Sequence, residues 1–237
     1  MRIDADFDYW AEINPGLSVW EARNSRDPDG QSRRLQSAHK FLWSKALPNG
    51  QFMELECIAR NQLQWGKFRL GSDSITNSYI SNIRIRAIVE KSKSHAAEMF
   101  RAGCRIGAFI LFPSYRVDRQ NTINGARGMN LKIADRIDLT LESIRRHYQG
   151  GESPLSTVLM RYANFFNLFM TFDEYVDFWL LNDIVDDKYN VQFYLPFDDF
   201  ERNGAPNSVQ EYQQMSESTI QFLRARTSRV ATHASNG

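Results

Sequence analysis

The chain has 237 residues, of which 42% are hydrophobic and 24% charged, and 29 Lys and Arg against 28 Asp and Glu give a net charge of +1. This length and composition are typical of a globular protein that buries its own core. The balanced charge argues against a sequence-indifferent nucleic-acid binder, which carries a basic excess. The two cysteines, Cys57 and Cys104, match no zinc or redox spacing, and we expect free, buried thiols.

The apolar runs are far shorter than the roughly 20 residues that cross a bilayer. Residues 1–10 are acidic and lack the apolar segment of a secretory signal. We therefore expect a cytoplasmic protein without a membrane partner. The sequence makes no prediction of the oligomeric state.

The first half of the chain predicts a short helix followed by a sheet. Residues 1–30 are rich in turn formers and are expected to form a surface extension pinned by Trp10 and Trp20. The apolar residues from Ser32 to Ser44 share one helical face. Strand-like alternation or apolar runs then predict a sheet of four to five strands, the last one central, over 52–57, 65–70, 83–89 and 105–112.

The second half of the chain is helical in its periodicity. Residues 131–149 predict an amphipathic helix with Asn130 as N-cap, ended by Gly150-Gly151. Further helices are predicted to begin at Ser153-Pro154 and at two capping boxes, Thr171–Glu174 and Ser208–Glu211. Residues 191–195 read as a late strand, and residues 228–237 as a frayed tail.

The order of these elements predicts one α+β domain spanning residues 1–237. Strands come first and helices second, which favours a mostly antiparallel N-terminal sheet packed against a C-terminal set of three to four helices. A regularly alternating α/β fold would interleave the two kinds of element instead. No linker divides the chain.

The stretch from Pro113 to Asn130 is long for a connection in a compact domain, which is typical of functional loops. Its arginines, Arg116, Arg119 and Arg127, carry forked donors suited to phosphate or carboxylate. Gly125 and Gly128 would let the backbone approach a ligand, and the helix predicted from residue 131 would direct free N–H groups into the same space. The candidate ligand-binding residues are Arg116, Arg119, Asn124, Arg127 and Arg136.

A structural reading of the same loop stays open. Neither the phosphate-loop nor the dinucleotide-binding fingerprint is present. Asn124-Gly125 is also a common hairpin turn. In that case the arginines would pair with acids such as Asp118, Asp135 or Asp138.

Acidic residues on the predicted helix 131–149 form a second candidate site. Asp135, Asp138 and Glu142 share one face, where carboxylates could hold Mg²⁺ or act as an acid–base group. Neighbouring Arg136, Arg145 and Arg146 make helix-surface ion pairs the alternative. Apart from this possible Mg²⁺, no cofactor and no metal site are predicted.

His39 is the first choice for a general base, and Asp135 and Asp138 complete the set of candidate catalytic residues. The alternative for His39 is a satisfied histidine within the core. No histidine shows metal-ligand spacing, and no nucleophile motif is present. Ser72-Asp73-Ser74 reads as a loop cap, so the sequence leaves open whether the protein is an enzyme.

Several short motifs carry a resemblance over residues 35 to 200. They are Leu42–Lys45 with Leu47–Gly50, Thr122–Gly128, Ile133–Glu142, Ser153–Leu155 and Leu195–Asp198. Together they resemble a group of uncharacterised bacterial proteins, chiefly actinobacterial. A cysteine often stands in that group where this chain has Ser143, so the resemblance implies no thiol chemistry here. It implies a bacterial cytosolic protein and no mechanism.

Two functional hypotheses follow. The first is a protein that binds a phosphate-bearing ligand, a nucleotide or a nucleic-acid end, through loop 113–130 and the start of helix 131–149. The second is a non-catalytic protein-interaction or regulatory module, since nucleophile, metal and cofactor signatures are missing. Arginines that converge on a cavity would favour the first hypothesis, and a broad apolar patch would favour the second.

Overall fold

The computed structural model describes residues 3–59 and 62–236 and has the α+β class that the sequence predicts. Two antiparallel sheets lie in the N-terminal half. β1 (Lys45–Ala46) pairs with β2 (Phe52–Met53), and four strands form the larger sheet in the order β3 (Glu56–Ala59), β4 (Gln62–Trp65), β5 (Phe68–Ser74) and β6 (Phe109–Pro113). Gly66, at φ 53°, supplies the left-handed residue of the tight turn between β4 and β5.

The strand β6 lies at the edge of the larger sheet, and its predicted central position is wrong. All five of its residues are nevertheless buried. α6 (Ile123–Met129) packs against β6, and the 3-10 turn Ile106–Ala108 just before it packs against α11 (Val209–Asn236). An edge strand that helices cover on both faces has the same apolar sequence as a central strand, so the sequence could not distinguish the two positions.

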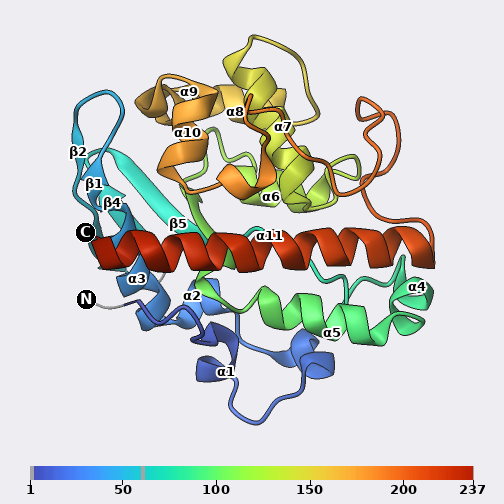
Figure 1. Cartoon of the computed structure of the whole chain (residues 1–237). Helices are drawn as coiled ribbons and strands as arrows, with labels where there is room; N and C mark the ends of the chain where they lie inside the picture. The colour runs from blue at the N-terminus through green and yellow to red at the C-terminus, as the bar shows by residue number, and fades with distance from the viewer. Residues whose placement is uncertain (1–2, 60–61, 237) are drawn as a thin grey trace.

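The long helix α11 runs across the whole molecule and separates two groups of helices in the view of Figure 1. One group comprises α1 (Tyr9–Ile13), α2 (Pro28–Gln31), α3 (Arg33–Trp43), α4 (Arg86–Glu90) and α5 (Lys93–Ala102). The other comprises α6, α7 (Ile137–Tyr148), α8 (Ser156–Arg161), α9 (Ala163–Phe166) and α10 (Phe172–Phe178). Short 3-10 helices cover Val19–Asn24, Asn167–Phe169 and Asn182–Ile184.

The sequence best predicted those helix N-termini that a side chain caps. The Ser32 hydroxyl accepts from the Leu35 N–H at 3.0 Å and opens α3, whose buried face matches the predicted one. Thr171 caps α10 in the same way, and the Ser208 hydroxyl accepts from the N–H of Glu211 at 3.1 Å where α11 begins. The N-cap half of each predicted capping box, the Thr171 or Ser208 hydroxyl, is therefore confirmed.

Two predicted strands are wrong. Residues 83–89 mostly form α4, because Ile85 and Val89, four positions apart, are the buried pair while Ile83 is 76% exposed. The segment 191–195 contributes one isolated bridge, from Val191 to Val185. The N–H of Tyr194 donates instead to the Asp138 carboxylate at 3.0 Å, so this segment is anchored by a side chain and not by a ladder.

The predicted start of one helix, the predicted end of another and one predicted contact also need correction. α7 begins at Ile137 and not at 131, because Ala134 and Asp135 adopt left-handed backbone angles that a helix cannot include. α11 continues to Asn236, so residues 228–236 are helical and not frayed, with Val230 buried. In the N-terminal extension, Trp10 packs edge-to-face on Phe100, whereas Trp20 is 43% exposed and has Lys93 Nζ 5.8 Å from the centre of its ring.

One buried arginine ties α11 to the rest of the core. Arg226 is fully buried and donates to the carbonyl oxygens of Gly107 and Phe109 at 2.6 and 3.0 Å. Its other nitrogens donate to the carbonyls of Trp179 and Leu180 at 3.0 and 3.2 Å. Burial lowers the pKa of Arg226 to about 10, because only neutral acceptors compensate the lost hydration.

Candidate functional site

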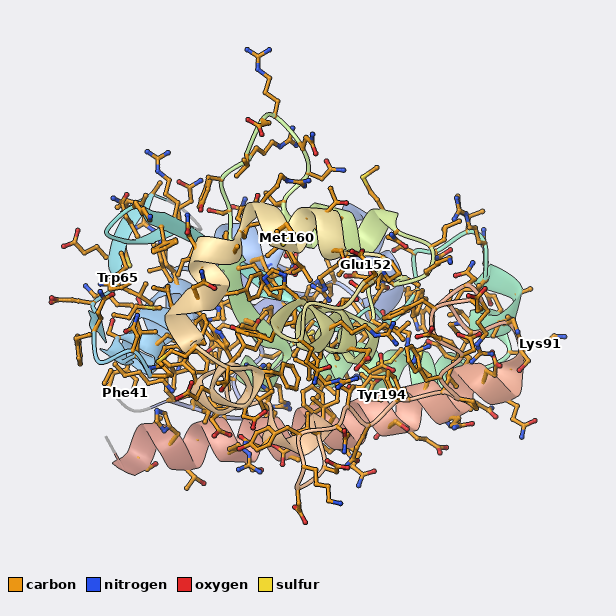
Figure 2. The ribbon with its side chains drawn as sticks, turned by 90° about the horizontal axis from the view of Figure 1, so that it is seen from above. Phe41, Trp65, Lys91, Glu152, Met160 and Tyr194 are labelled. Atoms are coloured by element: carbon orange, nitrogen blue, oxygen red, sulfur yellow. The ribbon has the colours of Figure 1, made fainter. Side chains whose placement is uncertain are left out.

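Only the first half of the predicted loop 113–130 is irregular, because the second half forms a helix. After β6 the chain projects outward over 114–122, the green loop at the top of Figure 2, and then forms α6. The Thr122 hydroxyl caps this helix by accepting from the Gly125 N–H at 3.3 Å. Asn124-Gly125 thus lies inside a helix, and the hairpin alternative is wrong.

Arg127 faces the protein interior. It has no exposed surface, its Nε donates to the Thr140 hydroxyl at 2.9 Å, and its guanidinium pairs with Asp73 of β5 and with Asp135 at 3.3 Å. Burial alone would lower the pKa of Arg127, but the two carboxylates more than offset this effect and raise it. Its charge is therefore used to hold α6, α7 and β5 together.

Arg136 is also buried and paired. Its guanidinium forms a two-pronged pair with Asp138, with Nε at 3.0 Å from one carboxylate oxygen. A third donor reaches the carbonyl oxygen of Gly204 at 2.9 Å. Arg136 and Asp138 thereby anchor the segment between α10 and α11 onto the start of α7.

The remaining two arginines of the predicted site are exposed. Arg116 and Arg119 lie on the projecting segment 114–122, and neither makes an ion pair with any residue that the structure describes. Asp118 and Arg119 both have left-handed backbone angles, at φ 52° and 58°, and form the turn of that segment. The four arginines therefore do not gather around one cavity.

Arg119 does line a hollow of about 400 Å³, together with Arg161 of α8. Arg161 donates to the Gln120 side chain at 2.9 Å and to the Asn121 carbonyl at 2.8 Å, while its Nε is buried without a partner. The lining contains two guanidinium groups and no carboxylate; its other residues are Gln120, Asn121, Ala126, Pro154, Thr157 and Val158.

His39 belongs to a buried chain of hydrogen bonds on the α3 side of β5. Trp43 Nε1, which can only donate, lies 3.1 Å from His39 Nδ1, so His39 Nε2 carries the ring proton and donates to the Ser72 hydroxyl at 2.9 Å. Burial, and then the charge of Arg226, lower the pKa of His39 to about 3. Neither ring nitrogen has a free lone pair, as in the satisfied core histidine that the sequence offered as the alternative.

The chain of hydrogen bonds ends at Asp29 of α2. Ser72 donates to one oxygen of Asp29, and the N–H of Ser74 donates to the other at 3.0 Å. Burial and the nearby charge of Asp27 raise the pKa of Asp29 to about 7, against the opposing effects of Ser72, Ser74 and Arg127. Ser72 and Ser74 lie in β5, so the predicted loop cap over 72–74 is wrong.

Asn124 lies apart from the arginines. It lines a cavity of about 200 Å³ with Thr122, Ser114 and the β5 residues Ser72 and Asp73. The Ser114 hydroxyl there is buried without a partner. Asn124 is thus placed beside the buried acid network and away from Arg119.

The predicted acidic face of α7 is divided among arginines. The Glu142 carboxylate, almost fully buried, binds Arg145 Nε at 2.7 Å and Arg146 Nε at 2.8 Å. Asp138 pairs with Arg136, and Asp135 lies on the preceding turn and pairs with Arg127. Within residues 3–59 and 62–236, no three His, Cys, Asp or Glu side chains are grouped as metal ligands. A catalytic role for Asp135 and Asp138 stays a prediction.

Two functional candidates were missed from the sequence. Arg161 lay within a run interpreted only as an apolar helix, and Asp29 within a turn. The signal for Arg161 was the absence of an acid three or four positions away, which left its charge without a local partner. Of the predicted thiols, Cys104 is buried but Cys57 is exposed.

Fold and site together define an α+β protein with a buried acid–arginine network and a separate exposed arginine hollow. A family model, described as a family of unknown function (DUF6994), matches residues 3–230, and the chain belongs to this family. Neither a curated protein nor a solved structure matches the chain. Over the described residues, no helix has both the length and the apolar character needed to cross a bilayer.

Proposed function

We propose that this protein binds a phosphate-bearing ligand in the hollow between segment 114–122 and α8. The observation that carries the proposal is the pair Arg119 and Arg161, which share one lining without a carboxylate. Two forked cations at one surface hollow suit a phosphate, which accepts several charge-assisted hydrogen bonds at once. A nucleotide or a nucleic-acid end is the proposed ligand.

The neutral part of the lining fits the same ligand. Gln120, Asn121 and Thr157 offer further polar groups, and Ala126, Pro154 and Val158 offer an apolar surface for the part of the ligand that carries the phosphate. Arg161 is held in place by Gln120 and Asn121 before any ligand arrives. Such preorganisation lowers the entropy cost of binding.

The loop offers a matched pair of variants for the test. Arg119 and Arg116 are both exposed on one segment and form no ion pair with a described residue, but only Arg119 lines the hollow. Arg119→Ala is expected to weaken binding of ATP or inorganic phosphate about tenfold, and Arg116→Ala to change it less than twofold. Isothermal titration calorimetry at low salt measures both; equal losses in the two variants would contradict the proposal.

Exposed apolar residues support the alternative, a protein-interaction module. Met129 at the end of α6, Leu131 just beyond it and Met160 of α8 are 71%, 52% and 64% exposed, and α6 contacts α8. Figure 2 shows Met160 on the outer side of α8. If Met160→Lys abolished capture of a partner while phosphate binding stayed intact, the interaction module would be the better description.

We also propose that the protein is bacterial and cytoplasmic. Bacterial origin is supported by the motif resemblance over residues 35 to 200. The cytoplasmic location is supported by the composition and by a free, exposed Cys57. Neither is needed for the binding test.

A further inference from the structure

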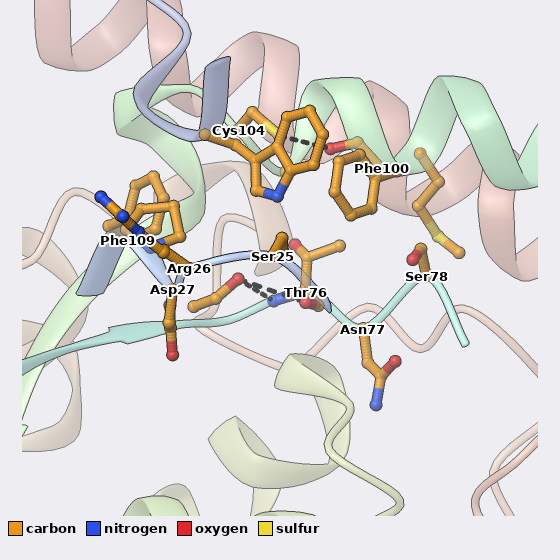
Figure 3. A pocket seen from close by; sticks show the side chains of 14 residues that line it. Ser25, Arg26, Asp27, Thr76, Asn77, Ser78, Phe100, Cys104 and Phe109 are labelled. Carbon is orange, nitrogen blue, oxygen red and sulfur yellow. Dashed lines mark hydrogen bonds between the residues drawn. The ribbon is translucent and has the colours of Figure 1, made fainter. Parts of the chain in front are cut away.

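A cavity of about 330 Å³ lies between α5 and the segment that follows β5 (Figure 3). Phe100 of α5 and Cys104 line one side, and Thr76, Asn77 and Ser78 line the other. Its lining shares no residue with the Arg119 hollow. The volume lies within the range of small-molecule sites, about 300–1,000 Å³.

Two buried polar atoms of the lining residues have no hydrogen-bond partner within the part of the chain that the structure describes. Trp10 is 7% exposed, and its Nε1–H makes no hydrogen bond; the Thr76 hydroxyl is buried and equally unpaired. A buried donor without an acceptor is costly, and folded proteins rarely keep one without a reason. Both residues line the same cavity, so one occupant contacts both side chains.

Two other polar side chains of the lining, Asn77 and Cys104, already have partners. The Asn77 amide donates to Asp135 at 3.4 Å and its oxygen accepts from the Tyr79 N–H at 2.8 Å. The Cys104 thiol donates to the Phe100 carbonyl at 3.2 Å, and burial raises its pKa, which rules it out as a thiolate nucleophile. Among the lining residues, the buried side-chain atoms without a partner are Trp10 Nε1 and the Thr76 hydroxyl.

The walls restrict the shape and charge of an occupant. Aromatic rings of Trp10, Phe100 and Phe109 line the cavity together with Met99. Rings of this kind favour a flat, unsaturated ligand over a branched one. Arg26 and Asp27 contribute one charge of each sign, so the lining favours an uncharged molecule.

We propose that this cavity is a binding site for a planar, uncharged heterocycle of the nucleobase class, whose rim acceptors take hydrogen bonds from Trp10 Nε1 and the Thr76 hydroxyl. The rings of the lining pack against its faces. The site is independent of the proposed phosphate hollow, and each can fail without the other.

Two conservative variants test the proposal on the full chain. Trp10→Phe keeps a ring and removes the N–H, and Thr76→Val replaces the hydroxyl by a methyl group. Each is expected to weaken binding of hypoxanthine or uracil about tenfold. Without ligand, the loss of the unsatisfied buried atom is not expected to lower the free energy of unfolding of either variant. If the two residues had only a structural role, both variants would bind the bases as tightly as the wild type.

Protein-observed 1H–15N NMR and calorimetry provide the measurements, with toluene as a flat probe that has no acceptor. Trp65→Phe, remote from the cavity, is the control and should bind the bases like the wild type. Binding of a base that shifts the Trp10 indole N–H resonance would support the site. Failure of both bases to bind at millimolar concentration, equal binding of toluene, or unchanged affinity in Thr76→Val would overturn it. If Trp10→Phe does not fold, Thr76→Val decides alone.

Discussion

The inner and the outer arginines of the region after β6 differ in what surrounds their charge. Arg127 is fully buried between Asp73 and Asp135, whereas Arg119 is exposed and faces a hollow without a carboxylate. Both come from one stretch of sequence that looked like a single anion site. The comparison teaches that a cluster of arginines in sequence can be divided by the fold into a structural part and an available part.

The largest expected effect is on the inner arginine. Arg127→Ala leaves Asp73 buried without its partner, and we expect the free energy of unfolding to fall by about 3–5 kcal/mol. Chemical denaturation followed by circular dichroism measures this. Arg119→Ala is the control and should stay within about 0.5 kcal/mol of the wild type; similar losses in both variants would erase the distinction.

A second effect, with an upper limit of similar size, is expected from pH, through Asp29. Its folded-state pKa of about 7 lies above the ordinary 3.8, so the folded state binds a proton that the unfolded state releases. The free energy of unfolding should therefore decline as pH rises from about 4 to about 7, by at most about 1.4 kcal/mol for each unit of separation.

Asp29→Asn provides the comparison for this pH dependence. The variant cannot ionise, and its side-chain oxygen can still accept from the Ser74 N–H. Urea denaturation across pH 4–8 should show a flatter profile for Asp29→Asn than for the wild type. Parallel profiles would mean that Asp29 titrates normally in the folded protein.

The smallest effect is expected from salt. Raising NaCl from 50 to 500 mM should weaken phosphate binding at the Arg119 hollow several-fold, because mobile ions screen exposed charges. The destabilisation caused by Arg127→Ala should stay nearly constant, since buried pairs are screened much less. Calorimetry and denaturation at the two salt concentrations measure these quantities, and salt-independent binding would place the phosphate elsewhere.

The fold was predictable wherever one local signal decided it. The caps at Ser32, Thr171 and Ser208 fixed helix starts because each satisfies N–H groups a few residues away. Prediction failed over 83–89, where alternating Ile and Arg fit a strand as well as a helix and tertiary packing selected the helix. The position of β6 in the sheet was also mispredicted, because an edge strand buried by helices has the same apolar sequence as a central strand.

The site was less predictable because its pairings are long-range. Arg127 pairs with Asp73, and His39 with Ser72, across different elements of the fold. No spacing rule connects such positions, whereas the exposed, polar character of Arg116 and Arg119 follows from their neighbours in sequence. The orphaned Trp10 N–H could not be foreseen, since only the packed structure shows which donors lack acceptors.

The four carbonyl contacts of Arg226 have a consequence for how the protein is made. The segments around Gly107 and Trp179 cannot have these backbone oxygens satisfied until residue 226 has been added to the growing chain. Earlier nascent chains would therefore hold a core that is open to water at this point. Completion of the fold during translation should wait until Arg226 leaves the ribosomal exit tunnel, and stalled chains that end before it should remain sensitive to protease.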